Sequence, residues 1–346
     1  MQKAGYFMYS FRNDYSEGVH PQILQALTET NFVQTCGYGM DPYCEKARDT
    51  IRGLCQAPDA DVHFLVGGTQ TNLLVINAFL DDFECVVCAH TGHINVHETG
   101  AIEATGHKVC TVYSEDGKLT PAMVDSVVKA HSSEHMVYPR MVYISNSTEI
   151  GTIYTKTELE ALSTYCKEHD LYLFMDGARL ASALTAPGND LTLADLAKLT
   201  DAFYIGGTKN GLLFGEALVV TADCKHFRWH MKQRGAILAK GRLLGVMYQA
   251  ALENGLYFDI ARHANEQAAR LRDSMMELGY KFPVPSTSNQ QFALIPKAVV
   301  SYLKDKGYEF ETERSGEEED LIRFVTSWAT PPEAIDTFLR DLAAAK

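Results

Sequence analysis

The sequence predicts an α/β protein in which helices cover both faces of a mostly parallel, doubly wound sheet. Two observations lead to this prediction. Apolar runs of strand length alternate with amphipathic stretches of helix length along most of the 346 residues. Two of the runs, residues 171–175 and 202–205, end abruptly on Asp176-Gly177-Ala178-Arg179 and Gly206-Gly207-Thr208-Lys209. Buried parallel strands end in this way at the edge of a sheet where ligands bind.

The remaining elements of this sheet follow from pattern and from helix-start signals. Pro21 is expected in the first turn of a helix, and Thr155 with Glu158 forms a predicted capping box. Further strands are expected at residues 61–66, 84–90, 107–113, 141–146 and 216–222. Helices are expected at residues 22–31, 41–56, 72–80, 121–132, 158–170 and 191–200, with a long helical region at 224–255.

The pattern changes near residue 257. A helix at 257–279 is followed by strands at 292–296 and 321–330, a helix at 298–307, an acidic loop at 314–320 and a final helix from Pro331. We therefore predict two domains: residues 1–256, an N-terminal arm plus the large α/β domain, and residues 257–346, a small C-terminal α+β domain.

Composition excludes several classes of partner. The chain is 46% hydrophobic and 22% charged, which is ordinary for a globular protein. Its formal net charge of −13 argues against nucleic acid or an anionic membrane as a partner. No stretch of about 18 apolar residues is present, and the amino terminus lacks the pattern of a signal peptide. A cytoplasmic location is expected.

The eight cysteines are expected to be free thiols of a reducing compartment. Cys85-x-x-Cys88 could indicate a zinc or redox pair. Since no second such motif follows, a strand carrying buried thiols is the favoured interpretation.

Asp176 and Lys209 form the central candidate pair. An aspartate and a lysine often make only a structural ion pair. Pyridoxal 5'-phosphate (PLP) chemistry instead needs a lysine to hold the aldehyde as a Schiff base and an acid to keep the pyridine nitrogen protonated. Both residues follow buried strands and are flanked by glycine or alanine, which would leave room for a flat ring, so we favour the cofactor interpretation.

A phosphate site is predicted where the strand at 61–66 meets the helix at 72–80. The connecting residues are Gly67-Gly68-Thr69-Gln70-Thr71-Asn72. Glycines let the backbone approach an anion, and the unpaired N–H groups of a helix start point towards it. The signatures of dinucleotide and Walker-type sites are absent. Gly68 and Thr69 are therefore candidates to hold the phosphate of PLP.

Histidines follow the strand at 84–90. The spacing of His90, His93 and His97, with Glu98 beside them, could suit zinc. A strand-to-helix turn need not bring all three onto one face, so no metal is predicted. His93 is instead a candidate to stack on a flat cofactor and exchange a proton with substrate; a solvated or core histidine is the alternative.

Arg323 alternates with Ile322 and Phe324 inside an apolar strand. A guanidinium there needs a partner, which could be a substrate carboxylate held in a bidentate fork or an internal carboxylate.

These motifs together resemble the threonine aldolase family of fold-type I PLP enzymes, most of all its phenylserine aldolase branch. The resemblance covers nearly the whole chain and rests on GGTQTN, HINVHETG, MDGARLASAL, TKNG and IRFVTSWAT. It implies that Lys209 binds the cofactor aldehyde, Asp176 its ring nitrogen and Gly68 with Thr69 its phosphate. His93 would stack on the ring and Arg179 would contact the cofactor. Arg323 would bind the substrate carboxylate.

Some positions depart from the family pattern. Asn13 stands where the family often has serine near the amino terminus; an amide can also contact the substrate carboxylate. The Ser-Lys-Gly common around the lysine is Thr208-Lys209-Asn210 here. An arginine that reaches a neighbouring subunit's phosphate is replaced near Lys240. The resemblance implies a homodimer or homotetramer with shared active sites.

The expected reaction is cleavage of a β-hydroxy-α-amino acid, of the threonine, allo-threonine or phenylserine type, to glycine and an aldehyde. His93 would take the β-hydroxyl proton. The alternatives are another fold-type I PLP enzyme of amino-acid metabolism, a β-eliminating lyase or an aminotransferase, then a binding protein without turnover and a zinc hydrolase.

Overall fold

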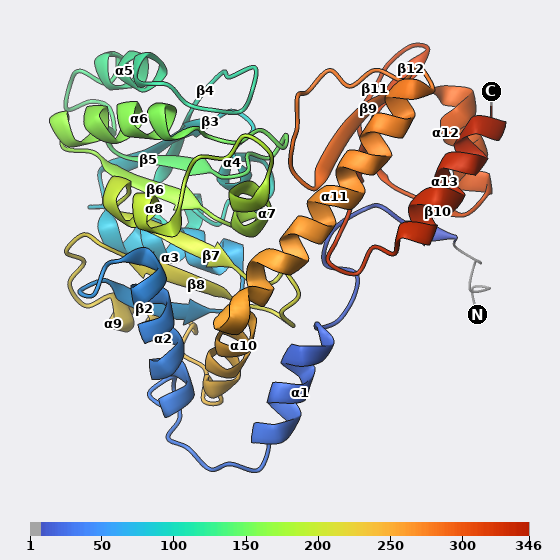
Figure 1. The fold of residues 1–346 in the computed structure, drawn as a ribbon. Coiled ribbons are helices and arrows are strands. Elements are labelled where there is room, and N and C mark those ends of the chain that lie inside the picture. The colour runs from blue at the N-terminus through green and yellow to red at the C-terminus, as the bar shows by residue number, and fades with distance from the viewer. Residues whose placement is uncertain (1–7, 346) are drawn as a thin grey trace.

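The computed structural model describes residues 8–345 and has a large mixed sheet beside a smaller antiparallel one (Figure 1). The first residues of the segment inspected for a signal peptide, 1–7, lie outside the described part. Among the described residues, no helix is both long and apolar enough to cross a membrane.

The large sheet has seven strands in the order β2-β8-β7-β6-β5-β3-β4. The strands from β7 to β4 pair in parallel, whereas β8 is antiparallel to both of its neighbours. The mostly parallel sheet that the sequence predicts is therefore confirmed, with one reversed strand. In sheet order the strands are Asp61–Leu65, Glu216–Val220, Ala202–Gly206, Tyr172–Asp176, Tyr138–Ser145, Glu84–Ala89 and Lys108–Val112.

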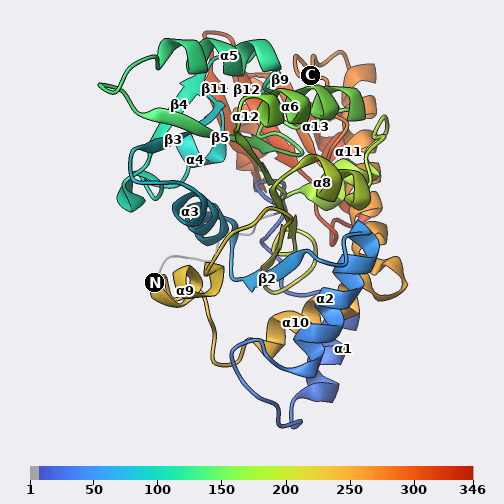
Figure 2. The ribbon, with the colours of Figure 1, turned by 90° about the vertical axis from the view of Figure 1, so that its left-hand side faces the viewer.

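Helices cover both faces of this sheet, and Figure 2 shows α3 and α8 on opposite sides of it. The Thr155–Glu158 capping box is present at the start of α6. From α1 to α10 the helices are Pro21–Thr30, Pro42–Cys55, Gly68–Phe79, His93–Val96, Pro121–Ala130, Lys156–Glu168, Leu180–Thr185, Leu193–Leu199, Phe227–Gln233 and Arg242–Leu252. Short 3₁₀ turns lie at Glu103–Thr105 and Glu253–Gly255.

The prediction of one long helical region at 224–255 was wrong. Gly235 has φ +71° and follows the end of α9, where the Ala236 N–H turns back to the carbonyl of Met231. Such a left-handed glycine ends a helix. The chain then runs as a loop to Gly241, and α10 begins at Arg242.

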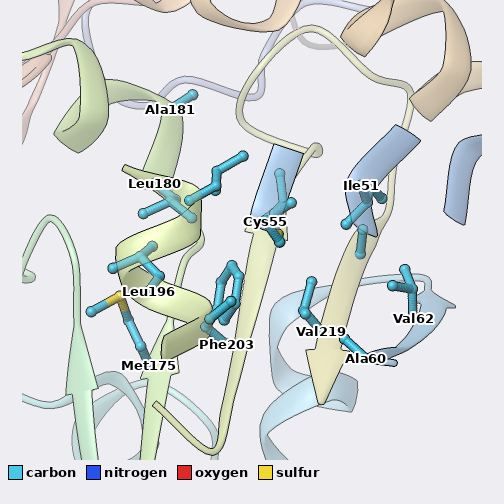
Figure 3. Packing of buried hydrophobic residues seen from close by; sticks show 14 of the residues in the cluster. Ile51, Cys55, Ala60, Val62, Met175, Leu180, Ala181, Leu196, Phe203 and Val219 are labelled. Carbon is cyan, nitrogen blue, oxygen red and sulfur yellow. The ribbon is translucent and has the colours of Figure 1, made fainter. Parts of the chain in front are cut away.

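Two large apolar clusters and a smaller one between α5 and strands β3 and β4 bury the faces of the large sheet. The cluster in Figure 3 joins α2 and α8 to strands β2, β6, β7 and β8, with Ile51, Leu196 and Phe203 buried in it. The next residue along β7, Tyr204, belongs to the cluster under α3 and α9 because neighbouring strand residues face opposite sides.

The alternation of side chains along a strand also explains why Cys85 and Cys88 do not form a pair. Cys85 and Cys88 are three residues apart on β3, so they face opposite sides of the sheet and lie in different apolar clusters. All eight cysteines are free, which confirms the thiol prediction, and six of them are buried.

The C-terminal unit is built on an antiparallel sheet in the order β11-β12-β9. The long helix α11 runs from the large sheet to this unit (Figure 1). Part of the expected acidic loop at 314–320 is strand, because β11 and β12 form a hairpin around it. From α11 to α13 the elements are Leu256–Glu277, Gln290–Pro296, Lys297–Asp305, Tyr308–Glu309, Glu311–Ser315, Glu319–Val325 and Pro332–Ala344.

The N-terminal arm packs against the C-terminal unit. Strand β1 (Tyr9–Ser10) pairs with β10, and Phe11 is buried against Phe324 and Phe338. This anchoring fixes the residues that follow, including Asn13 and Asp14, beside the large sheet.

Candidate active site

A cavity of about 340 Å³ opens at the carboxyl ends of the large sheet's parallel strands. Its volume lies within the roughly 300–1,000 Å³ typical of small-molecule sites. Six residues predicted from the sequence line it together: Gly68, Thr69, His93, Asp176, Arg179 and Lys209. The sheet therefore brings together side chains that are up to 141 positions apart in the sequence.

Asp176 is the last residue of β6 and is 5% exposed. Its Oδ2 accepts hydrogen bonds from the Tyr143 hydroxyl at 2.6 Å and the Asn72 amide at 3.0 Å, and its Oδ1 accepts one from the Ala178 N–H at 2.9 Å. Burial favours the neutral acid, but the nearby His93 and the hydrogen bonds from Tyr143 and the Ala178 N–H hold the pKa of Asp176 below its usual value. The group is a fixed anion suited to a cationic ring nitrogen.

Lys209 follows β7 in a loop that folds back to β8. The hydroxyl of the preceding Thr208 donates to Glu216 and accepts from the Gly215 N–H, which closes this loop. Burial and the nearby Arg179 guanidinium lower the pKa of Lys209. A lysine with a lowered pKa has more neutral amine available for bonding an aldehyde.

Gly177 and Gly206, near Asp176 and Lys209, are required by close backbone packing and not only by the room that a flat ring needs. A Cβ on Gly177 would lie 1.7 Å from the Tyr204 carbonyl oxygen, and one on Gly206 would lie 2.5 Å from that of Gly177. The loops after β6 and β7 thus pack backbone to backbone, and these glycines set the spacing of Asp176 and Lys209.

A chain of hydrogen bonds joins His93 to Asp176. The Nδ1 atom of His93 lies 2.8 Å from Oε1 of Glu98, which also accepts from the Asn72 amide at 2.7 Å. The same amide nitrogen donates to Asp176. With Nδ1 turned to a carboxylate, the Nε2 atom of His93 is the one free to accept a proton.

The start of α3 suits a phosphate. Its N-cap, Gly67, provides no side-chain cap for the first N–H groups of this 12-residue helix. A Cβ on Gly68 would lie 3.0 Å from the Tyr204 hydroxyl, a tight contact that glycine avoids. Free N–H groups and the helix dipole favour an anion beside Thr69. These residues and the Asp176–Lys209 pair fit PLP.

Arg179 reaches across the site to the N-terminal arm. Its Nε and Nη2 atoms lie 2.8 and 3.0 Å from the two carboxylate oxygens of Asp14, which also accepts from the Asn289 amide at 2.9 Å. Burial opposes this charge, but Arg179 and Lys209 hold the pKa of Asp14 below its usual value. Arg179 lines the cavity while being held by this fork.

Two residues predicted to bind the substrate carboxylate, Asn13 and Arg323, do not line this cavity, and neither does Lys240. Asn13 accepts hydrogen bonds from the Tyr15 N–H and the Ser16 hydroxyl, which caps a local turn. Arg323 pairs with Glu313 on the adjacent strand at 3.2 Å, the internal ion pair that the sequence left as an alternative. Lys240 lines a separate hollow.

Sequence reasoning missed three acidic residues at the site. Asp14 directly follows Asn13 in the sequence, and Glu216 is the first residue of a strand. Glu149 follows β5, and its Oε1 accepts from the His93 N–H at 2.9 Å and the Ser145 hydroxyl at 2.6 Å. Burial raises the pKa of Glu149. For Glu149, its place just past the end of a buried strand was the available signal.

Comparison with known proteins agrees with this site. The model of the beta-eliminating lyase family matches residues 11–298. A low specificity L-threonine aldolase of a Pseudomonas species is 32% identical over 96% of this chain and 97% of its own length. The chain belongs to the threonine aldolase family. It is therefore a PLP-dependent lyase, as predicted.

Solved structures agree with this family membership. The threonine aldolase of Leishmania major has a TM-score of 0.95 and 48% sequence identity, with 96% of this chain and 98% of that chain covered. An aspartate aminotransferase of Thermus thermophilus has a TM-score of 0.71 at 16% identity over 97% and 91% of the two chains, which shows the shared fold alone. The predicted fold-type I class is confirmed for this threonine aldolase family member.

The zinc alternative finds no support in the geometry. In the described part of the chain, no three His, Cys, Asp or Glu side chains are grouped so that they could hold a metal ion. The ring of His90 stacks on Tyr113, and the ring of His93 lies 5.4 Å from that of His97.

Proposed function

We propose that this protein cleaves a β-hydroxy-α-amino acid to glycine and an aldehyde with PLP as cofactor. The observation that carries the proposal is the meeting of Lys209, Asp176 and His93 around one cavity. The names of the relatives from Pseudomonas and Leishmania support the same activity.

Each end of the cofactor has residues suited to it. Lys209 would bond the aldehyde carbon, the Asp176 carboxylate would face the ring nitrogen, and the start of α3 at Gly68 and Thr69 would receive the phosphate. When bound, PLP supplies a cationic ring that withdraws electrons from the bond broken at Cα. The fixed negative charge of Asp176 stabilises that ring because it needs no reorganisation during the reaction.

His93 is the proposed acceptor of the β-hydroxyl proton. Its ring is about one third exposed and lines the cavity, while Glu98 is fully buried behind it. A buried carboxylate that accepts from Nδ1 orients the ring and stabilises the imidazolium formed when Nε2 takes a proton. Proton transfer of this kind contributes typically 10²–10⁴-fold to a rate.

Arg323 and Asn13 are the proposed ligands of the substrate carboxylate. Burial lowers the pKa of His97, and the nearby His93 and Arg323 add to this effect, so the Arg323 guanidinium acts electrostatically on a histidine next to the site. Its Nε atom is buried without a hydrogen-bond partner in the described residues. A carboxylate could satisfy that atom if the Glu313 pair opens.

A homodimer or homotetramer with shared active sites completes the proposal. Apolar side chains are exposed in the loop after α1, with Phe32 94% and Met40 62% exposed, and a second copy could cover them. Lys240 lines a hollow beside this loop and could reach a partner's phosphate site. Light scattering on the purified protein tests the assembly, and a monomer would contradict it.

The deciding experiment follows the spectrum and the products of the purified protein. We expect a visible absorption band from bound PLP and aldehyde release from threonine, allo-threonine or phenylserine. The fold also supports aminotransferases, as the Thermus structure illustrates, so transamination and β-elimination are assayed in parallel. A coloured protein that releases no aldehyde from any of the three would exclude the aldolase.

A further inference from the structure

Glu216 is a buried acid that the functions assigned above do not use. It is the first residue of β8, is 3% exposed and lines the cavity that contains Lys209. Its Oε1 accepts a hydrogen bond from the Thr208 hydroxyl at 2.9 Å, and its Oε2 accepts one from the Gly207 N–H at 3.2 Å. Glu216 therefore holds the two residues that directly precede Lys209.

A lysine must lose a proton from its ammonium group before it bonds an aldehyde, and it regains a proton after it is released. The amine is nucleophilic only when neutral, whereas the free side chain in water is an ammonium ion. A buried amine cannot exchange this proton quickly with bulk water unless a neighbouring group receives it. The carboxylates whose charges act on Lys209 are Asp14, Asp176 and Glu216.

Two of these carboxylates, Asp14 and Asp176, already make contacts that stabilise their negative charge. Asp14 is held in the fork of Arg179, and Asp176 accepts three hydrogen bonds. Both sets of contacts stabilise the anion, and the pKa of each acid is lowered although burial opposes this. Neither acid is therefore suited to accept a proton from Lys209 near neutral pH.

Glu216 differs from both, because Asp14 pairs with a guanidinium and Asp176 accepts three hydrogen bonds, whereas Glu216 accepts two, both from neutral donors. Burial raises the pKa of Glu216 to about 8, although Thr208 and the charge of Lys209 oppose the change. Burial and Arg179 lower the pKa of Lys209. The pKa values of the two groups therefore move towards each other, which favours transfer of a proton between them.

We propose that Glu216 is the proton partner of Lys209. When the lysine is to bond an aldehyde, an Nζ–H bond of its ammonium breaks and an O–H bond forms on the Glu216 carboxylate, by way of one water because the two side chains line the same cavity without a direct ion pair, so both groups become neutral. When the lysine is released, the proton returns to it. No other reactant is needed, because the same proton moves in both directions.

The charged and titratable groups around the pair come from several elements. They are Asp14 from the N-terminal arm, Asp176 and Arg179 at the end of β6, and the hydroxyls of Tyr204, Tyr248 and Tyr257 from β7, α10 and α11. Burial raises the pKa of all three tyrosines well above the range of interest, so they stay neutral and do not compete for the proton.

The test replaces Glu216 by Gln, which keeps the shape and an oxygen acceptor but cannot take the proton. The holoenzyme is mixed with glycine, which has no β-carbon to cleave, and the exchange of Lys209 for the glycine amine is followed by stopped-flow absorbance between pH 6 and 9. General acid–base effects predict a loss of about 100-fold or more in the exchange rate for E216Q at neutral pH. The wild-type rate should change around pH 8, and that transition should be absent from E216Q.

Infrared difference spectra give an independent readout. A protonated-carboxyl band should titrate near pH 8 in the wild type and be missing from E216Q. Glu84→Gln is the matched control, because Glu84 is also a buried acid whose pKa burial raises, but it lies on β3 and pairs with Arg140. Its exchange rate should equal that of the wild type.

Equal exchange rates in wild type and E216Q, or a Glu216 carboxyl that titrates in the ordinary acidic range, would overturn the proposal. Thr208→Val separates proton transfer from loop positioning, because it removes the hydrogen bond from the Thr208 hydroxyl to Glu216 but leaves the Glu216 carboxyl in place. The variant should keep the infrared band. The proposal rests on the proposed function only in needing Lys209 to bond the cofactor. Aldehyde release with an unaffected exchange rate would leave the aldolase standing and exclude this role of Glu216.

Discussion

His93 and Asp176 are joined by a continuous chain of hydrogen bonds through Glu98 and Asn72. The residue proposed to take the substrate proton and the residue proposed to face the cofactor ring are thus held in one buried network. Asn72 bridges the carboxylates of Glu98 and Asp176 with one amide nitrogen.

Glu98→Gln tests the orientation of His93. The amide keeps the size of Glu98 but loses the charge that stabilises an imidazolium, so we expect kcat for aldehyde release to fall by about 100-fold. The visible spectrum of the bound cofactor should be unchanged, because Lys209 and Asp176 remain. A variant with wild-type kcat would show that His93 does not act as the base.

His93→Phe separates the aldolase from its rivals. Phenylalanine keeps a flat ring at the cavity but has no nitrogen to accept the β-hydroxyl proton, so aldehyde release should fall by about 10²–10⁴-fold. Transamination and β-elimination need no base at that hydroxyl and should largely persist if either is the native reaction. Aldehyde release and the two rival reactions are measured on the same preparation. His90→Phe is the control, because the His90 ring stacks on Tyr113 and does not line the cavity.

Lys209→Ala should abolish turnover and remove the covalently bound chromophore. The stability of the apoprotein should not fall, because the wild-type lysine is buried at a cost that its lowered pKa reports. Absorbance, aldehyde release and thermal unfolding are compared with Lys108→Ala, an exposed lysine on β4. Persistent turnover in Lys209→Ala would show that Lys209 is not the residue that bonds the cofactor.

Asp14→Asn should destabilise the protein in a pH-dependent way. It leaves the Arg179 guanidinium without its carboxylate, which costs about 3–5 kcal/mol when a buried pair is broken. The pKa of Asp14 is lowered on folding, so its stabilisation is complete above the unfolded-state pKa and is lost as pH falls through the lower folded-state pKa. Chemical unfolding at several pH values should therefore show wild type and variant converging in acid. A constant difference between them would contradict the assignment.

Gly177→Ala should disrupt the site although it adds one methyl group. The new Cβ would meet the Tyr204 carbonyl oxygen at 1.7 Å, so the loops after β6 and β7 must separate and PLP retention should fall sharply. Gly53→Ala is the matched control in α2, where nothing lies within 4 Å of the new Cβ. It should stabilise the helix by about 0.5–1 kcal/mol. Equal PLP content in both variants would contradict this account.

Strand endings made much of the site predictable. Asp176 and Lys209 each stand where an apolar run stops, and the ends of parallel strands share one edge, so their meeting followed from pattern alone. The same logic located Gly68 and His93. It failed at Glu216 because β8 runs antiparallel, and the acid stands at the beginning of that strand rather than after its end.

Local periodicity determined the order of strands and helices, the parallel character of the sheet and the placement of Asp176 and Lys209 at its edge, since these depend on neighbours in the chain. Only the tertiary structure decided that Asp14 pairs with Arg179 and that Glu216 holds the Lys209 loop. It also decided that Arg323 meets Glu313 and that α9 and α10 are separate helices. A charged side chain selects its partner by distance in space, and the residues that surround a buried group are set by packing between segments that are far apart in the sequence.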